Sequence, residues 1–310
     1  MRVHADRLLE RARRRWASLA SARPDLAAAI DLQRRLVGRS LALGAALDEQ
    51  QPPPLALAPA EAVSRLNAKR PVLADSAVEL DPDRFESFVL AFCDDFARGG
   101  AAGPAARLRS ALERREIDLG SLLAASLLRQ QHAIRTKAHH VGVAPDLLWL
   151  VAELAVAPLA HRLQSRCLTG AAAGDIALRA ALDAWDEGSC PACGSWPALS
   201  EVVDDARSLR CSFCGAAWRP PTRRCIYCTE DGTALLAAAL TEAEQAVRRL
   251  ELCRTCGGYL KSLTVAAPTP FELLPVEDLA SSDLDAGAAE RGYARPPMRE
   301  VHAYNRDPCD

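Results

Sequence analysis

Four C-x-x-C pairs between residues 190 and 256 constrain the fold of this chain more than any other feature. Two residues between cysteines let a tight turn, here called a knuckle, aim both sulfurs at one metal ion, and two knuckles complete a tetrahedral four-sulfur shell. The sequence therefore predicts two metal sites with eight cysteine ligands: Cys190, Cys193, Cys211, Cys214, Cys225, Cys228, Cys253 and Cys256.

The residue after each pair supports this prediction. Gly194, Gly215 and Gly257 follow three of the pairs, and glycine readily adopts the positive φ that a knuckle needs. Thr229 follows the pair Cys225/Cys228 instead. We expect that knuckle to be more strained or more labile than the others.

The spacing between pairs favours sequential grouping. It gives C-x2-C-x17-C-x2-C for the first site, inside the usual range for zinc ribbons, and C-x2-C-x24-C-x2-C for the second, slightly beyond it. Nested or interleaved grouping stays open, although nesting would leave little room for a hairpin between Cys214 and Cys225. Short strands are expected around the knuckles, as in rubredoxins and zinc ribbons, at residues 197–203, 208–210, 246–252 and 259–265.

Two other uses of the cysteines are less favoured. A disulfide framework needs an oxidising compartment, and the first sixteen residues, MRVHADRLLERARRRW, contain no apolar signal region. Redox catalysis by a single C-x-x-C needs a lowered thiol pKa next to a βαβ pattern, and no such pattern precedes any of the four pairs.

The first 187 residues are predicted to form an all-helical domain. Proline stands where the first turn of a helix would begin at five positions, and amphipathic runs follow. Between Phe85 and Phe96 apolar residues recur every three or four positions, so Cys93 is expected to be buried on one helix face. The prolines are Pro24, Pro59, Pro82, Pro104 and Pro145, and further helices are expected at 119–137, 145–166 and 176–185.

The whole chain is therefore expected to be a multi-domain protein. Residues 1–187 would form the all-α domain, 188–224 the first tetracysteine ribbon, 225–266 the second, and 267–310 a helix at 275–291 with a poorly ordered tail from 296. The apolar run 147–160 contains Glu153 and Pro158 and is too short to span a bilayer. We expect a cytoplasmic protein without a membrane span.

Evidence for other chemistry is weak. The sequence has no Walker loop, G-x-G-x-x-G, G-x-S-x-G or H-E-x-x-H motif, and four-sulfur sites lack an open coordination position, so no catalytic residue is nominated and no enzyme is predicted. His132, His139 and His140 are expected to be solvated or capping residues. A formal net charge of −2 argues against nucleic acid as a partner, despite arginines near the second and third knuckles.

The ordered set CPACGSWPALSEV, LRCSFCGAAWR, RRCIYC, LELCRTCGGYLKSL, PVEDLASSDLD and ERGYAR resembles the formate dehydrogenase accessory protein (FdhE) family. The resemblance is strongest from residue 190 to 295; the ending PPMREVHAYNRDPCD departs from it. It implies a cytoplasmic helper that binds the catalytic subunit of a respiratory formate dehydrogenase before twin-arginine export. It also implies that the eight cysteines hold metal in rubredoxin-like centres.

Three matters stay open at this point. Tetrahedral sulfur suits both iron and zinc, so the metal is not identified. A rubredoxin-like electron carrier and a nucleic-acid-binding zinc ribbon remain alternative functions.

Overall fold

The computed structural model describes residues 2–49, 57–74, 78, 80–170, 174–220, 224–239 and 247–296. By spatial contact these residues form two compact units. The helical unit contains residues 2–49 and 80–163, and the sheet unit contains 57–74 and 164–296. The domain boundaries predicted from the sequence, at residues 187, 224 and 266, stay a proposal. The QPPP segment and the tail beyond 296, for which a rigid turn and poor order were predicted, lie outside the described residues.

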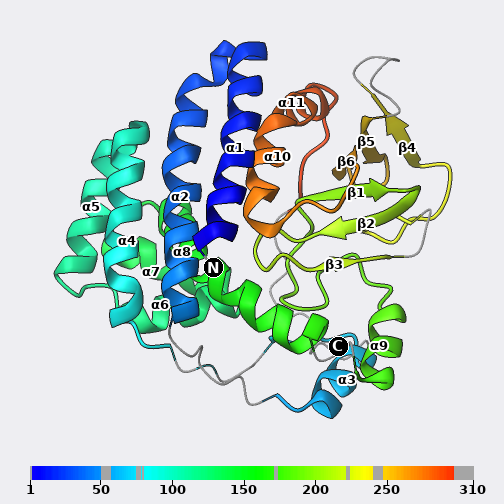
Figure 1. The fold of residues 1–310 in the computed structure, drawn as a ribbon, viewed down its shortest axis with the longest axis horizontal. Helices are drawn as coiled ribbons and strands as arrows, with labels where there is room; N and C mark the ends of the chain where they lie inside the picture. The colour runs from blue at the N-terminus through cyan, green and yellow to red at the C-terminus, as the bar shows by residue number, and fades with distance from the viewer. Residues whose placement is uncertain are drawn as a thin grey trace. The chain divides into compact units, whose positions relative to one another are not determined.

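The helical unit is built from amphipathic helices, and α1, α2, α4 and α5 lie side by side (Figure 1). Cys93 is 1% exposed on the face of α4 that also buries Phe85, Val89 and Phe92, which confirms its prediction as a core residue. The helices are α1 (Arg2–Ala22), α2 (Ala27–Glu49), α4 (Asp83–Phe96), α5 (Ala102–Glu113), α6 (Leu119–Leu127), α7 (Gln131–Val141) and α8 (Pro145–Gln164).

Two helices predicted as continuous are each interrupted. The expected helix 119–137 ends at Leu127, because Arg129 adopts φ 57°, and α7 begins at Gln131. The expected helix 275–291 is divided at Ser281 into α10 (Leu274–Ala280) and α11 (Ser282–Glu290). The Ser281 hydroxyl donates to the carbonyl of Glu277 at 2.8 Å, a local bond that competes with continued helix.

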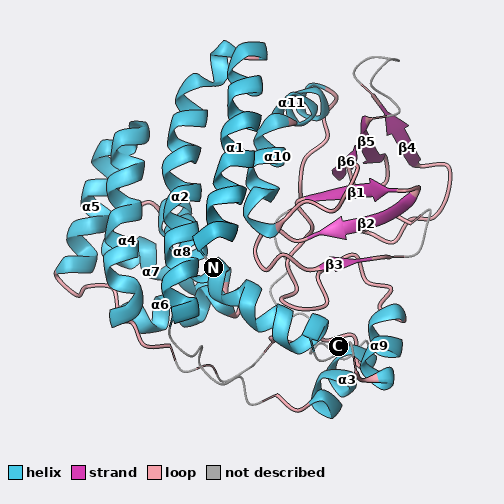
Figure 2. Cartoon of the chain, in the orientation of Figure 1, coloured by secondary structure: helices cyan, strands magenta, loops and turns pink. Residues whose placement is uncertain are grey.

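The sheet unit contains one six-stranded sheet with the order β3-β2-β1-β6-β5-β4 (Figure 2). Strands β1 and β6 are parallel, while the other neighbours are antiparallel. Strands from both predicted ribbons therefore share one sheet through the β1–β6 pair. The strands are β1 (Leu199–Val203), β2 (Ala206–Arg210), β3 (Ala217–Trp218), β4 (Leu235–Ala238), β5 (Arg248–Cys253) and β6 (Tyr259–Thr264).

The predicted fold class is confirmed: a helical first part is followed by a β-region with two tetracysteine groups and a C-terminal helical segment. Four strands lie where the sequence predicted them, whereas β3 and β4, with two and four residues, were missed. The remaining helices of the sheet unit are α3 (Pro59–Asn67) and α9 (Ile176–Asp183), which pack together. No helix among the described residues has the length and apolar character needed to cross a membrane.

One face of the sheet is covered by the C-terminal segment. Leu284 and Ala288 of α11, both fully buried, pack on Leu199, Leu250 and Leu263 of the strands. Lys261 of β6 is also fully buried, and its Nζ lies 2.6 Å from Asp278 Oδ1 and 2.8 Å from Asp285 Oδ2. Apolar packing and the ion pairs of Lys261 with Asp278 and Asp285 together hold α10 and α11 on the sheet.

The substitution Leu284→Ala is expected to lower the free energy of unfolding by roughly 2–5 kcal/mol, because it leaves a cavity under the sheet. Urea denaturation measures the loss. Ile176→Ala is the control, since Ile176 is 83% exposed and its truncation is expected to change stability by less than about 0.5 kcal/mol. Equal effects of the two substitutions would contradict the packing described here.

Candidate metal centre

All four knuckles adopt the same backbone geometry. In each, the amide of the residue that follows the second cysteine donates to the carbonyl of the first cysteine, at 2.9 to 3.0 Å. That residue has a positive φ in every case: 79° at Gly194, 77° at Gly215, 64° at Thr229 and 66° at Gly257. Thr229 thus occupies a left-handed conformation that costs a residue with a Cβ roughly 1–2 kcal/mol. The strain expected at the third knuckle is confirmed.

The knuckles bring the eight cysteines into two groups, Cys190/Cys193/Cys211/Cys214 and Cys225/Cys228/Cys253/Cys256. Sequential grouping is confirmed, and the nested and interleaved alternatives are wrong. Across the two knuckles of the first group, the sulfur of Cys190 lies 3.5 Å from that of Cys214, and Cys193 lies 3.6 Å from Cys211. In the second group, the Cys225–Cys256 and Cys228–Cys253 sulfur distances are both 3.7 Å. A disulfide bond is about 2.05 Å long, so these are free thiols and the disulfide alternative is also wrong.

The spacing of the sulfurs fits one metal ion per group. A tetrahedral ion with metal–sulfur bonds of about 2.3 Å separates its ligands by about 3.8 Å, close to the distances found. Within each group all four sulfurs lie within 4.8 Å of one another. A ligand set that consists of four cysteine sulfurs suits zinc or iron.

The first group is completely buried, and a segment distant in sequence supports it. The amides of Val72 and Leu73 donate to the carbonyls of Pro191 and Ala192, the two residues inside the first knuckle, at 2.8 Å each. Arg65 holds this segment in place, because its Nη1 donates to the carbonyl of Val72 at 2.6 Å. Sequence analysis missed these residues, and no motif marks them.

Burial also disfavours the ionised form of two thiols in the first group. Desolvation raises the pKa of Cys190 and of Cys214 well above the usual value for a thiol. The ring nitrogen of Trp185 donates to the carbonyl of Ser189 at 2.9 Å, so the residues that lead into this knuckle are held by a buried tryptophan.

The second group is more open. Cys225 and Cys253 are buried, Cys228 is partly buried and Cys256 is exposed. Burial acts to raise the pKa of Cys253, but hydrogen bonds from the amides of Cys256 and Thr255 lower it below the usual value. In the same group, burial raises the pKa of Cys225. The thiols of this group therefore differ more in environment than those of the first.

The two groups are packed against each other within the sheet unit. A Cβ at Gly188, which precedes the first knuckle, would lie 1.8 Å from the Ile226 carbonyl oxygen in the third, so only glycine fits there. The rings of Trp196 and Tyr227 meet edge to face, with centroids 5.1 Å apart and an interplanar angle of 81°. The Tyr227 hydroxyl donates to the carbonyl of Tyr259 at 2.9 Å, which anchors the third knuckle on β6.

The histidines considered from the sequence belong to neither cysteine group. His132, His139 and His140 are on α7, the latter two in its last turn. Among the described residues, the only clusters able to hold a metal ion are the two cysteine groups.

Comparisons with known proteins agree with this architecture, although no family model matches the chain. The chain is 37% identical over 110 residues to "Protein FdhE" of Escherichia coli O127:H6, a match that covers 34% of the chain and 35% of that protein. It is 36% identical over 113 residues to "Protein FdhE homolog" of Edwardsiella ictaluri. These matches span about a third of the length of the curated relatives.

A structural match extends over nearly the whole chain. The crystal structure of the FdhE protein from Pseudomonas aeruginosa superposes with a TM-score of 0.57 and 26% identity, covering 95% of each chain. The local sequence matches and the structural match together support the FdhE family for this chain. The sequence resemblance is thereby confirmed, and the FdhE fold includes both the helical first part and the region with the cysteine groups.

When the protein is reconstituted with zinc and treated with a coloured chelator, zinc is expected to leave in two phases. The fast phase should come from the second group, because Cys256 is exposed and Thr229 is strained. Cys256→Ser should remove the fast phase. Zinc loss confined to the first group would contradict this order.

Thr229→Gly is expected to slow the fast phase roughly fivefold, because it relieves about 1 kcal/mol of backbone strain at the third knuckle. The same chelator kinetics measure the change. Thr233→Gly is the matched control: Thr233 is exposed and has no positive φ, so its substitution should leave the rate unchanged.

Proposed function

We propose that this protein is a non-enzymatic accessory protein that binds the catalytic subunit of a formate dehydrogenase and supports its maturation before export. The observation that carries the proposal is the pair of tetracysteine groups in a chain of the FdhE family. The family resemblance supplies the client. We further propose that it acts in the cytoplasm, where reducing conditions keep the thiols free.

In this proposal the eight cysteines hold two metal ions, iron or zinc. Bound metal would mainly supply folding energy, since a structural zinc site contributes on the order of 10 kcal/mol of apparent binding free energy. The ends of β1, β2, β5 and β6 all lead into knuckles, so loss of an ion is expected to loosen the sheet unit.

Co-purification tests the proposal. Tagged protein, co-expressed with a formate dehydrogenase catalytic subunit, is expected to retain that subunit. Cys190→Ala should abolish retention, because it removes one sulfur from the buried group. Ile176→Ala, an exposed change in the same unit, should retain it fully. Failure of the wild-type protein to retain the subunit would exclude this function.

A rubredoxin-like electron carrier is the second candidate function. The exposure of Cys256 favours it, since electron transfer requires close approach to the site. Voltammetry of iron-loaded protein would then show a reversible couple that disappears in Cys256→Ser. A zinc-only protein that supports full maturation of the client would exclude a redox role.

A further inference from the structure

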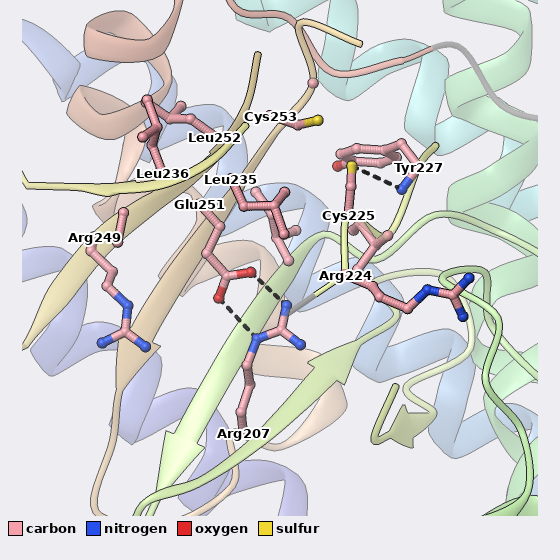
Figure 3. Close-up of a pocket in the computed structure, with 14 residues that line it drawn as sticks. Arg207, Arg224, Cys225, Tyr227, Leu235, Leu236, Arg249, Glu251, Leu252 and Cys253 are labelled. Atoms are coloured by element: carbon pink, nitrogen blue, oxygen red, sulfur yellow. Dashed lines mark hydrogen bonds and ion pairs between the residues drawn. The ribbon is translucent and has the colours of Figure 1, made fainter. Parts of the chain in front are cut away.

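A pocket of about 400 Å³ lies beside the second cysteine group on the sheet (Figure 3). Strands β4, β5 and β6 contribute most of its wall, together with Arg207 of β2 and the third knuckle. Its volume is within the range of known ligand sites, about 300–1,000 Å³. We propose that this pocket binds an extended peptide segment of a partner protein that carries an acidic side chain between apolar ones.

The pocket wall carries both a neutralised carboxylate and an arginine. Glu251 is neutralised, because Arg207 donates from Nε and Nη2 to its two carboxylate oxygens at 2.9 and 2.5 Å. The Ser200 hydroxyl donates to the same carboxylate at 3.2 Å. Figure 3 shows Arg207 and Glu251 pointing toward each other, with Arg249 on the neighbouring part of the pocket. The positive charge that remains on this part of the wall belongs to Arg249.

Arg249 is partly buried, and within the part of the chain that the structure describes its side chain makes no hydrogen bond or ion pair. A guanidinium that is partly removed from water is well suited to a carboxylate, which it can hold through two parallel hydrogen bonds. Arg249 therefore offers the pocket a cation whose partner is missing from the described chain.

Compensation of thiolate charge does not account for Arg249. Arg249, Glu251 and Cys253 alternate along β5 and so face the same side of the sheet. Four residues of strand separate Arg249 from Cys253, a distance of roughly 13 Å, whereas the atoms of an ion pair lie within about 4 Å of each other. The cation and the metal group lie at opposite ends of one row of side chains.

On the face of the sheet that carries Arg249, the pairing register places apolar residues of two neighbouring strands, Leu235 and Ala237 of β4 and Leu260 of β6, and the third knuckle with Arg224 completes the wall. A ligand that meets both Arg249 and the leucines must extend along β5 over several residues. An extended peptide has the same repeat as the strand and can place an acidic side chain at Arg249 and apolar side chains against the leucines. A compact anion would reach the arginine alone.

The probe for this proposal is the dye-labelled peptide acetyl-Leu-Ser-Glu-Ser-Leu-amide, whose leucines and glutamate lie on one face when the peptide is extended; it is compared with its Gln counterpart on the full-length, zinc-reconstituted protein. Fluorescence polarisation is expected to show binding of the Glu peptide roughly tenfold tighter than the Gln peptide. Arg249→Gln should remove this preference, and Arg249→Lys should restore part of it. Arg219→Gln, an exposed change of equal charge outside the pocket, should leave it intact.

Equal affinity for the Glu and Gln peptides, or an unchanged preference for the Glu peptide in Arg249→Gln, would overturn the proposal. So would competition by 4-methylpentanoate as strong as that by the unlabelled peptide, because it would indicate a small-molecule site. The zinc content of each variant is measured as well, so that a loss of peptide binding caused by loss of zinc can be distinguished from one caused by the changed pocket residue. No formate dehydrogenase enters the assay, so its outcome is independent of the client proposed above.

Discussion

Convergence of four thiols on one point is the constraint on which the structure of the sheet unit depends. Each knuckle achieves it with one residue in the left-handed region and one amide-to-carbonyl bond across the turn. Buried thiolates without a cation would be costly, as the raised pKa of Cys190 and of Cys214 shows. An ion with four sulfur ligands removes that cost, and it also links the two knuckles that adjoin the strands.

The two groups share a scaffold and differ in their surroundings. The parallel pairing of β1 with β6 joins their hairpins into one sheet, and the Trp196–Tyr227 contact fills the space between them. Around the first group, backbone bonds from Val72 and Leu73 complete a buried shell. Around the second, Cys256 is exposed and a pocket opens next to Cys225 and Cys253. The first group is therefore enclosed by the fold, whereas the second is open at one cysteine and borders a pocket.

Prediction from the sequence succeeded where the signal was local. The C-x-x-C spacing and the glycines after the pairs predicted the knuckles and favoured their sequential grouping. The presence of Thr229 in place of glycine predicted strain at the third knuckle. Proline positions and apolar periodicity indicated the helices and the burial of Cys93. Prediction failed where local signals conflict with tertiary structure: Arg129 interrupts a run with strong helical character, and its guanidinium lies 4.6 Å from the centroid of the Trp149 ring. Strands β3 and β4 are too short for a recognisable alternation.

By itself the sequence determined the four knuckles and the helical first part and favoured sequential grouping of the knuckles, because these follow from spacing and backbone preferences; the structure then excluded the other groupings. Tertiary structure alone decided that residues 57–74 belong with the sheet, that Cys256 of the second group is exposed, and that Arg249 lines a pocket and forms no ion pair with another described residue. The physical reason is that burial and strand pairing arise from contacts between segments distant in the chain. Cys190 and Cys256 have the same local motif, and their different exposure is set by what packs over them.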